Sequence, residues 1–261
     1  MKICEFCKCN KIKKHWYYSN LHICDNCELG FNDITHKFDY NSDTDFELSD
    51  KKMRIWRKFA ERDFSLLNID FTGKTILEIG CGYGFLGSLI EDRYENVKYL
   101  YNEANADMKT FLKSCDKSVL ENCFDYEGKV DIIILNHVFE HICDASIFFE
   151  SLNNKYNNSE IILFQTNYQG IIPRLFPFLW YGYSFDQHYY HFSIKSILKF
   201  FNKYGYEMSL HKYYKLDQAF SFTIKGFAKL FLSFINVFIA GKNSDAFMIY
   251  LKKTNTDKVT K

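Results

Sequence analysis

The sequence is poor in proline and in net charge. Its 261 residues include only two prolines, Pro173 and Pro177, and its formal net charge is +1. This balance of charge argues against a protein that binds nucleic acid over its whole surface. A local basic patch is compatible with the balanced charge. The sequence contains no internal repeat and no low-complexity tract, so we expect an ordinary globular chain.

The sequence also lacks a segment that is apolar and long enough to cross a bilayer. Its most apolar late stretch, residues 226–240, is too short and carries Lys229 and Asn236, whereas a membrane helix needs about 20 apolar residues. The N-terminus runs directly into a cysteine cluster rather than into an apolar segment, so we expect no signal peptide. We therefore expect a cytoplasmic protein.

Cysteine, in contrast, is abundant. Four of the nine cysteines form two C-x2-C pairs that are separated by sixteen residues. Each pair can direct two thiolates to one metal, and two pairs complete a tetrahedral zinc site without an open position. We therefore expect a structural zinc in a small module at residues 1–35, with Cys9 as an alternative to its neighbour Cys7. The expected ligands are Cys4, Cys7, Cys24 and Cys27.

Apolar runs and helical spacings alternate along the rest of the chain. The expected strands are 75–79, 98–102, 130–135, 160–165 and 245–253, and the expected helices are 84–92, 105–114, 144–156 and 193–204. This alternation predicts an α/β fold with a mostly parallel sheet and helices on both faces. We expect residues 36–70 to form a linker and a leading helix, and residues 71–261 to form the main domain.

The stretch TILEIGCGYGFLGSLIE, residues 75–91, places three glycines between an expected strand and an expected helix. Glycine permits positive φ and lets backbone N–H groups approach a ligand closely. The spacing G-x-G-x-G differs from the G-x-G-x-x-G fingerprint of dinucleotide sites. Glu103 ends the next strand, where a carboxylate can accept hydrogen bonds from both hydroxyls of a ribose. These features predict a site for a nucleoside-containing ligand.

The stretches LEIGCGYG and VDIIILNHVFEHICD together resemble the class I S-adenosylmethionine-dependent methyltransferases. The resemblance extends over roughly residues 70–205 and implies a Rossmann-like methyltransferase fold with S-adenosylmethionine as the cofactor. It implies that Glu78 and the glycines contact the methionine part, that Glu103 holds the ribose, and that Asn122 and Cys123 lie near the adenine. The implied cofactor-binding residues are Glu78, Gly80, Cys81, Gly82, Gly84, Glu103 and Asn136.

Two further stretches resemble bacterial enzymes that modify sugars and surface glycans. YYSNLHICDNCELGF resembles the C-x2-C-G-L-x-F knuckle that precedes many such methyltransferases, with Glu28 in place of the usual glycine. FDQHYYHFSIKSILKFFNKYGY resembles the E-H-x-x-Y-F-S segment of zinc-containing sugar C-methyltransferases, with Gln187 in place of the acidic residue before His188. The resemblance implies methylation in surface polysaccharide biosynthesis, with O-methylation of a sugar or phosphorylated sugar as the leading interpretation and C- or N-methylation as alternatives.

A sugar hydroxyl is a poor nucleophile, so a general base that titrates near neutrality helps methyl transfer. His188 and His191 lie in an aromatic segment after the fourth expected strand, and His137 lies just past the third. We expect His141 to be a packing residue, an interpretation that is also open for His191, and Glu140 to order a loop or a neighbouring histidine. The candidate catalytic residues are His188, His137 and His191.

Several partners and functions stay open at this stage. We expect a small-molecule or glycan acceptor and no nucleic acid. The aromatic segment 168–187 has four possible roles, namely a lid, a protein interface, a contact for a lipid-linked acceptor, or part of the core. RNA methylation is a rival function because a zinc module and a short basic run at residues 11–15 suit docking. Against it, residues 136–139 read Asn-His-Val-Phe, without the [DN]-P-P-[YF] segment of many base-methylating enzymes. A non-catalytic interaction module is the third class.

Overall fold

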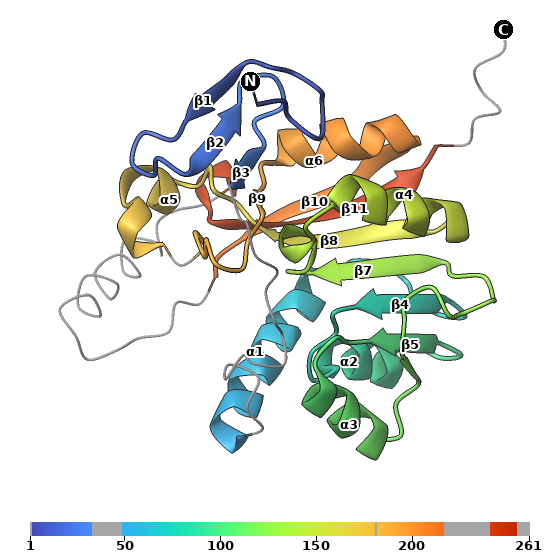
Figure 1. Ribbon diagram of the computed structural model, residues 1–261. Helices are drawn as coiled ribbons and strands as arrows, with labels where there is room; N and C mark the ends of the chain where they lie inside the picture. Colours follow the sequence, from blue (N-terminus) through green and yellow to red (C-terminus); the bar gives the residue numbers. More distant parts are fainter. Residues whose placement is uncertain (1, 33–48, 181, 217–240, 255–261) are drawn as a thin grey trace, which may run out of the picture. The chain divides into compact units, whose positions relative to one another are not determined.

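The computed structural model describes residues 2–32, 49–180, 182–216 and 241–254 (Figure 1). The expected linker at 36–50 and the apolar stretch at 226–240 lie almost wholly outside these ranges. The chain divides into two compact units that each contain several segments. One unit comprises Met1–Lys37, Phe139–Phe148 and Leu163–Lys261, and the other comprises Phe38–Val138 and Phe149–Ile162.

The second of these units contains a parallel sheet around the glycine loop. Its strands are β4 (Thr75–Ile79), β5 (Lys98–Asn102), β6 (Val119–Leu120) and β7 (Ile132–Asn136), in the order β7-β4-β5-β6. All three pairings are parallel. Residues 132–135 are three isoleucines and a leucine, all buried, as is typical of a parallel strand with both faces covered. The expected mostly parallel α/β sheet is confirmed.

Among the described residues, three helices lie wholly in this unit, namely α1 (Asp50–Leu66), α2 (Phe85–Arg93) and α3 (Ala106–Ser114). Asn105 caps α3, because its side chain accepts hydrogen bonds from the backbone N–H groups of Asp107 and Met108 at 3.0 Å. Helix α2 begins directly after Gly84, whose φ of +70° is left-handed. Helix α2 contacts β5 (Figure 1). Helix α3 contacts β6.

The first unit contains a small antiparallel sheet. Its strands are β1 (Ile12–Lys14), β2 (Leu21–Cys24), β3 (Gly30–Asn32) and β9 (Tyr190–His191), paired in that order. Strand β9 comes from far along the chain, and it pairs with β3 through Gly30 opposite His191. A Cβ atom on Gly30 would lie 3.0 Å from the Cβ of His191, so a larger residue here would require His191 to shift. The sheet joins the cysteine-rich N-terminus to the histidine segment.

Phe6, between the first two cysteines, anchors that N-terminus in an aromatic core. Its ring is fully buried, and its centroid lies 4.2 Å from that of Phe200 and 5.4 Å from that of Tyr190. Phe139 and Phe192 also pack against it. The cysteine-rich segment therefore shares its hydrophobic core with residues more than a hundred positions away in the sequence.

The remaining elements complete the chain. Strand β8 begins in one unit and ends in the other, and β10 and β11 pair antiparallel with a register shift between Met208 and Leu210. Their bounds and those of the other helices are β8 Glu160–Thr166, β10 Tyr206–Tyr214, β11 Ala246–Lys253, α4 Ala145–Lys155, α5 Ile171–Leu175, α6 Ile194–Phe201, and the 3₁₀ helices η2 Phe139–His141, η3 Pro177–Leu179, η4 Asn202–Tyr204 and η5 Gly241–Asn243.

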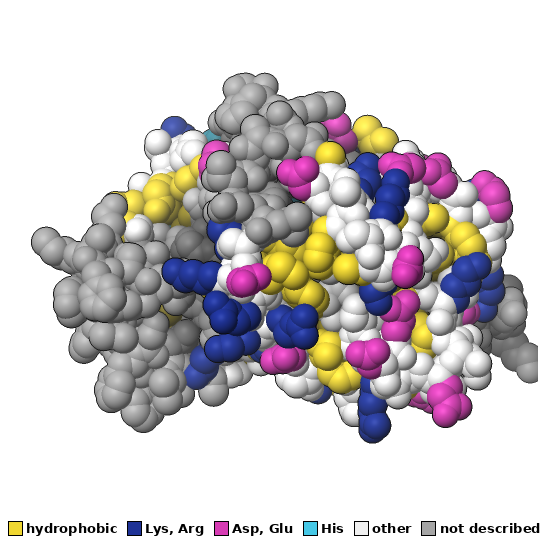
Figure 2. Space-filling model, turned by 90° about the horizontal axis from the view of Figure 1, so that it is seen from below, with side chains coloured by type: hydrophobic (Ala, Val, Ile, Leu, Met, Phe, Trp, Pro, Cys, Tyr) yellow, Lys and Arg dark blue, Asp and Glu magenta, His cyan; other side chains and the backbone are white. Residues whose placement is uncertain are grey.

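Within the described ranges no helix is long and apolar enough to span a membrane. Figure 2 shows one face of the molecule, on which several basic side chains lie close together in one area, and basic and acidic side chains are both scattered over the rest. The chain therefore carries a local accumulation of positive charge despite its net charge of +1.

We expect Phe6→Ala to lower the free energy of unfolding by about 3 to 5 kcal/mol, because it removes a large side chain from a closed aromatic cluster. Ile147, on α4, is 66% exposed, so Ile147→Ala is the control and should cost no more than about 0.5 kcal/mol. Chemical denaturation of both variants tests this. Equal losses in the two variants would show that Phe6 does not anchor the N-terminus.

Candidate functional site

The glycine loop between β4 and α2 has two closely packed positions and one open position. Gly80, Gly82 and Gly84 have φ values of +68°, +54° and +70°. A Cβ atom would lie 2.4 Å from a methyl of Val138 at Gly80, and 2.6 Å from a methyl of Leu112 at Gly84. At Gly82 it would meet no described atom within 4 Å. Packing thus explains two of the glycines, while Gly82 borders space that a ligand can fill.

Glu103 holds this loop in place. One carboxylate oxygen accepts the N–H of Gly82 at 2.7 Å, and the other accepts the N–H groups of Ala104 at 2.8 Å and Asn105 at 2.9 Å. The backbone N–H groups of Gly80 and Cys81 both point to the carbonyl oxygen of Asn102. The loop is therefore fastened to the carboxyl end of β5, where ligands of such sheets bind.

Glu78 is buried and Cys81 is half-buried beside the loop, and their surroundings disfavour the charged form of both side chains. Burial raises the pKa of the Cys81 thiol well above its usual range, so this residue supplies small size rather than reactivity. Burial also raises the pKa of Glu78 to about 8, and the charges of Asp63 and Glu103 add to the effect. The Tyr99 hydroxyl donates a hydrogen bond to the Glu78 carboxyl at 2.8 Å.

Asn136, at the end of β7, presents a buried oxygen atom. Its amide nitrogen donates to Asp63 at 3.0 Å, and Asp63 is also paired with Arg62 at 2.8 Å. Its amide oxygen is buried and has no hydrogen-bond partner among the described residues. A buried acceptor of this kind is suited to a donor from a ligand, such as an ammonium group. Sequence reasoning missed Asp63, although an acidic residue on the buried side of α1 was a visible signal.

The residues around the loop fit S-adenosylmethionine. Glu78 and Asn136 offer oxygen atoms to a cationic amino acid group, Gly82 leaves room for a ligand beside the backbone, and Glu103 stands where a ribose binds in such folds. Of the expected adenine neighbours, Cys123 is buried and its carbonyl accepts the hydroxyl of Tyr156 at 2.9 Å. Contact of these residues with the cofactor stays a prediction.

The structure brings His188 together with Glu140 and His141 in the first unit. One ligand atom from each of the three lies within 4.8 Å of the other two. The rings of His141 and His188 meet edge to face at a centroid distance of 4.6 Å. Nδ1 of His188 lies 3.0 Å from the carbonyl oxygen of Gly182, so the ring donates there and turns Nε2 in the other direction.

The other two histidines lie in different surroundings. His191, in β9, is fully buried, and its Nε2 lies 3.0 Å from the amide nitrogen of Asn32. Burial holds the pKa of His191 well below its usual range. His137, with φ of +54°, directly follows β7 and precedes Val138, the residue that packs on Gly80. His137 therefore belongs to the surroundings of the glycine loop.

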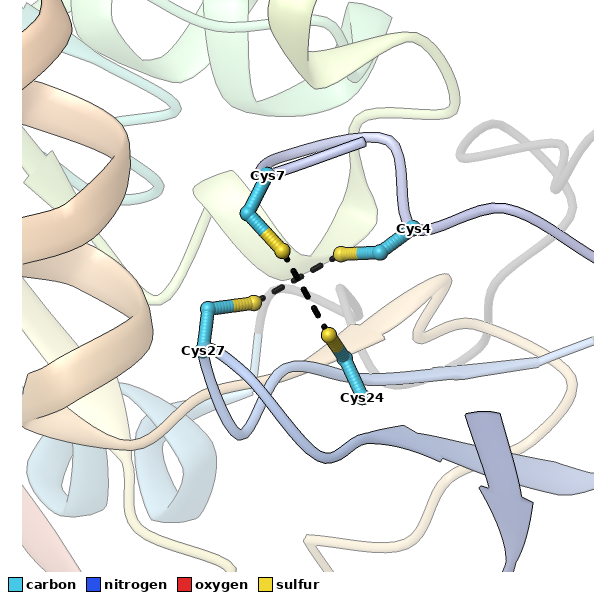
Figure 3. A group of neighbouring side chains, drawn as sticks. All are labelled: Cys4, Cys7, Cys24 and Cys27. Atoms are coloured by element: carbon cyan, nitrogen blue, oxygen red, sulfur yellow. Dashed lines mark hydrogen bonds between the residues drawn. The ribbon is translucent and has the colours of Figure 1, made fainter. Parts of the chain in front are cut away.

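Figure 3 shows the sulfur atoms of the four cysteines of the C-x2-C pairs pointing toward one another. Sγ of Cys4 lies 3.5 Å from Sγ of Cys27, and Sγ of Cys7 lies 3.4 Å from Sγ of Cys24. Tetrahedral zinc thiolates require sulfur atoms about 3.8 Å apart, so the donor set and spacing suit zinc. Cys9 is not part of this group.

Comparison with known proteins identifies the family. A family model described as a methyltransferase domain matches residues 48–211. N-methyltransferase 4 of Papaver somniferum is 27% identical over 104 residues, which cover 35% of this chain and 29% of that protein. The chain therefore matches less than a third of that curated relative's length. It belongs to the methyltransferase domain family, within the class I S-adenosylmethionine-dependent methyltransferases.

Solved structures agree on the fold. A SAM-dependent methyltransferase from Archaeoglobus fulgidus is 18% identical, with 77% of this chain and 94% of that chain covered and a TM-score of 0.52. Magnesium protoporphyrin IX methyltransferase (ChlM) from Synechocystis PCC 6803 with bound SAM is 11% identical, with coverages of 80% and 86% and a TM-score of 0.51. The expected Rossmann-like methyltransferase fold is thus confirmed.

We expect Glu78→Gln to change the pH dependence of stability. A carboxyl whose pKa is about 8 when folded and near 4.3 when unfolded opposes folding increasingly as pH rises between these values. Relative to the wild type, Glu78→Gln should gain on the order of 4 kcal/mol of unfolding free energy between pH 5 and pH 8. Denaturation curves at both pH values measure it.

The exposed Glu150 on α4 supplies the control, and Glu150→Gln should change stability equally at both pH values. If Glu78→Gln and the wild type differ by the same amount at pH 5 and pH 8, Glu78 is ionised in the folded protein.

Proposed function

We propose that the protein transfers a methyl group from S-adenosylmethionine to a hydroxyl of a sugar or a phosphorylated sugar in surface polysaccharide biosynthesis. The proposal of methyl transfer rests on one observation. In a chain of the methyltransferase family, the position at Gly82 is open and lies near Glu78, Glu103 and Asn136. The proposal that the acceptor is a sugar is supported by the N-terminal segment and the histidine segment, which resemble those of glycan-modifying enzymes.

In this proposal the residues of the second unit hold the cofactor. Glu78 and Asn136 bind its amino acid part, the backbone at Gly80 to Gly84 borders it, and Glu103 binds the ribose. S-adenosylmethionine supplies a methyl group that is already activated by a positively charged sulfur. The chain therefore needs to orient the acceptor hydroxyl, exclude water and remove one proton.

His137 is the proposed base, because it directly follows Asn136 and its neighbour Val138 packs on the glycine loop. His188 is proposed to contact the acceptor, with its orientation set by the Gly182 carbonyl. His191 is proposed as a positioning residue, because the Asn32 amide nitrogen that it meets also donates to the backbone oxygen of His188 at 2.7 Å.

The proposed partner is a small-molecule or glycan acceptor. Leu175 and Phe178 are each 56% exposed in α5 and η3, and they offer an apolar surface to a lipid-linked form of the acceptor. RNA is the weaker alternative, because Lys13 of the short basic run is paired with Asp25 at 2.8 Å. A cytoplasmic location is part of the proposal, since thiolate ligands persist in a reducing compartment.

We also propose that Cys4, Cys7, Cys24 and Cys27 hold a structural zinc ion. Their sulfur atoms converge, and four thiolates leave no position for a substrate. Zinc would tie the strand that ends at Cys24 to the segment around Phe6, and through β3 to β9. This metal would therefore support the segment that carries His188 without taking part in the reaction.

We expect labelled methyl groups to pass from S-adenosylmethionine to pools of nucleotide sugars or phosphorylated sugars, and not to total RNA. His137→Gln should lower turnover by about 100-fold or more, because it removes the base, and should leave S-adenosylmethionine binding unchanged. His211→Gln, at an exposed position of β10, is the matched control, and Glu103→Ala is the blank.

Label in RNA alone would contradict the sugar assignment and make the zinc module a docking element. Label in no pool, while S-adenosylmethionine still binds, would refute these acceptors. Full activity in His137→Gln would remove this histidine from the mechanism.

We expect the purified protein to contain one zinc ion per chain by elemental analysis. Cys24→Ser should lose that zinc and several kcal/mol of stability, because metal binding free energy contributes directly to folding. Cys115→Ser, at an exposed cysteine outside the cluster, should keep both. Zinc retained at full stoichiometry in Cys24→Ser would contradict the four-cysteine site.

A further inference from the structure

The group formed by Glu140, His141 and His188 combines three donor side chains from two segments of the first unit. Their ligand atoms all lie within 4.8 Å of one another, whereas the two segments are nearly fifty residues apart in the sequence. Glu140 is fully buried, His188 is 8% exposed, and His141 is half-buried. The group is therefore shielded on most sides and reachable at His141.

Main-chain contacts hold the two segments at this spacing. The N–H of Tyr189 donates to the carbonyl oxygen of Glu140 at 2.8 Å. On the other side of the same segment, Asn32 donates its main-chain N–H to the carbonyl oxygen of Tyr189 at 3.0 Å and its side-chain amide to the carbonyl oxygen of His188 at 2.7 Å. The donor atoms are thus positioned by the backbone of three segments before any ligand binds.

The orientation of His188 is the one that a metal-binding histidine usually has. A histidine that ligates a metal commonly donates its other ring N–H to a carbonyl or a carboxylate, which fixes the tautomer. Nδ1 of His188 lies 3.0 Å from the Gly182 carbonyl oxygen, so Nε2 carries the lone pair. Two imidazoles and one carboxylate are a donor set that divalent first-row transition metals bind well.

We propose that Glu140, His141 and His188 bind one divalent transition-metal ion at a site separate from the four cysteines. Three protein ligands leave coordination positions open, as in catalytic metal sites and in contrast to structural zinc. Two neighbouring oxygen atoms of an acceptor fill such positions. This last role rests on the proposed function, whereas metal binding itself does not.

The role in methyl transfer follows from ordinary metal chemistry. A hydroxyl that coordinates a divalent cation loses its proton more readily than a free hydroxyl. The ion would bind and acidify the acceptor hydroxyl, and its proton would pass to a base or to water. His188 would then contact the acceptor through the metal, in agreement with its proposed acceptor-binding role.

The test uses Co²⁺ as the probe on the full chain, with the four-cysteine site filled beforehand with zinc. We expect one Co²⁺ per chain, with visible absorption bands that lack the charge-transfer band of cobalt–thiolate bonds. Glu140→Gln and His188→Ala should each weaken Co²⁺ binding by at least about 10-fold, the lower end of the effect of losing a supporting group. Glu140→Gln preserves the side-chain shape.

His211→Ala, at the exposed position on β10, should bind Co²⁺ like the wild type. Absence of Co²⁺ binding by the wild-type protein, or equal affinity in wild type and His188→Ala, would overturn the proposal and leave a hydrogen-bonded cluster. Because the readout is metal binding, a Co²⁺-loaded protein that transfers no methyl group to sugars would refute the proposed function alone.

Discussion

The hydrogen bonds accepted by the Glu103 carboxylate are the interactions on which the glycine loop and the proposed cofactor site depend. One carboxylate accepts backbone N–H groups from Gly82, Ala104 and Asn105. It therefore fixes the glycine loop to the end of β5 and to the start of α3, which Asn105 caps. Because a buried carboxylate is costly unless it is hydrogen-bonded, this arrangement favours one loop conformation. That conformation leaves the space beside Gly82 open.

A comparable constraint organises the histidines of the first unit. Strand β3, which follows the cysteine pairs, presents Asn32 to the backbone of His188 and Tyr189. Phe6 packs in the same unit against the aromatic residues of α6 and β9. The N-terminal segment is therefore structurally continuous with the proposed acceptor segment. A metal ion among the cysteines would stabilise the positions of Glu140 and His188 at a distance.

The sequence was informative wherever local chemistry decides the structure. β4 and β5 lie at their predicted bounds, because β4 is a buried aliphatic run that leads into the glycine turn and β5 has three consecutive buried apolar or aromatic residues. β10 was not predicted, since only its two end residues are buried and it lacks an apolar pattern, so its pairing with β11 specifies it. The proximity of Glu140, His141 and His188 also depends on tertiary contacts. The sequence predicted His188 as a site residue but treated His141 as packing.

The central claim is that S-adenosylmethionine binds in the space beside Gly82. Calorimetric titration of the protein with S-adenosylmethionine tests this claim most directly. Gly82 and Gly73 both have positive φ, +54° and +69°, and no described atom within 4 Å of an added Cβ, so Gly82→Leu and Gly73→Leu introduce comparable backbone strain. We expect the wild type and Gly73→Leu to bind S-adenosylmethionine alike, and Gly82→Leu to bind at least about 10-fold more weakly because its side chain fills the site. Equal affinities in the two variants, or no binding by the wild type, would contradict the account.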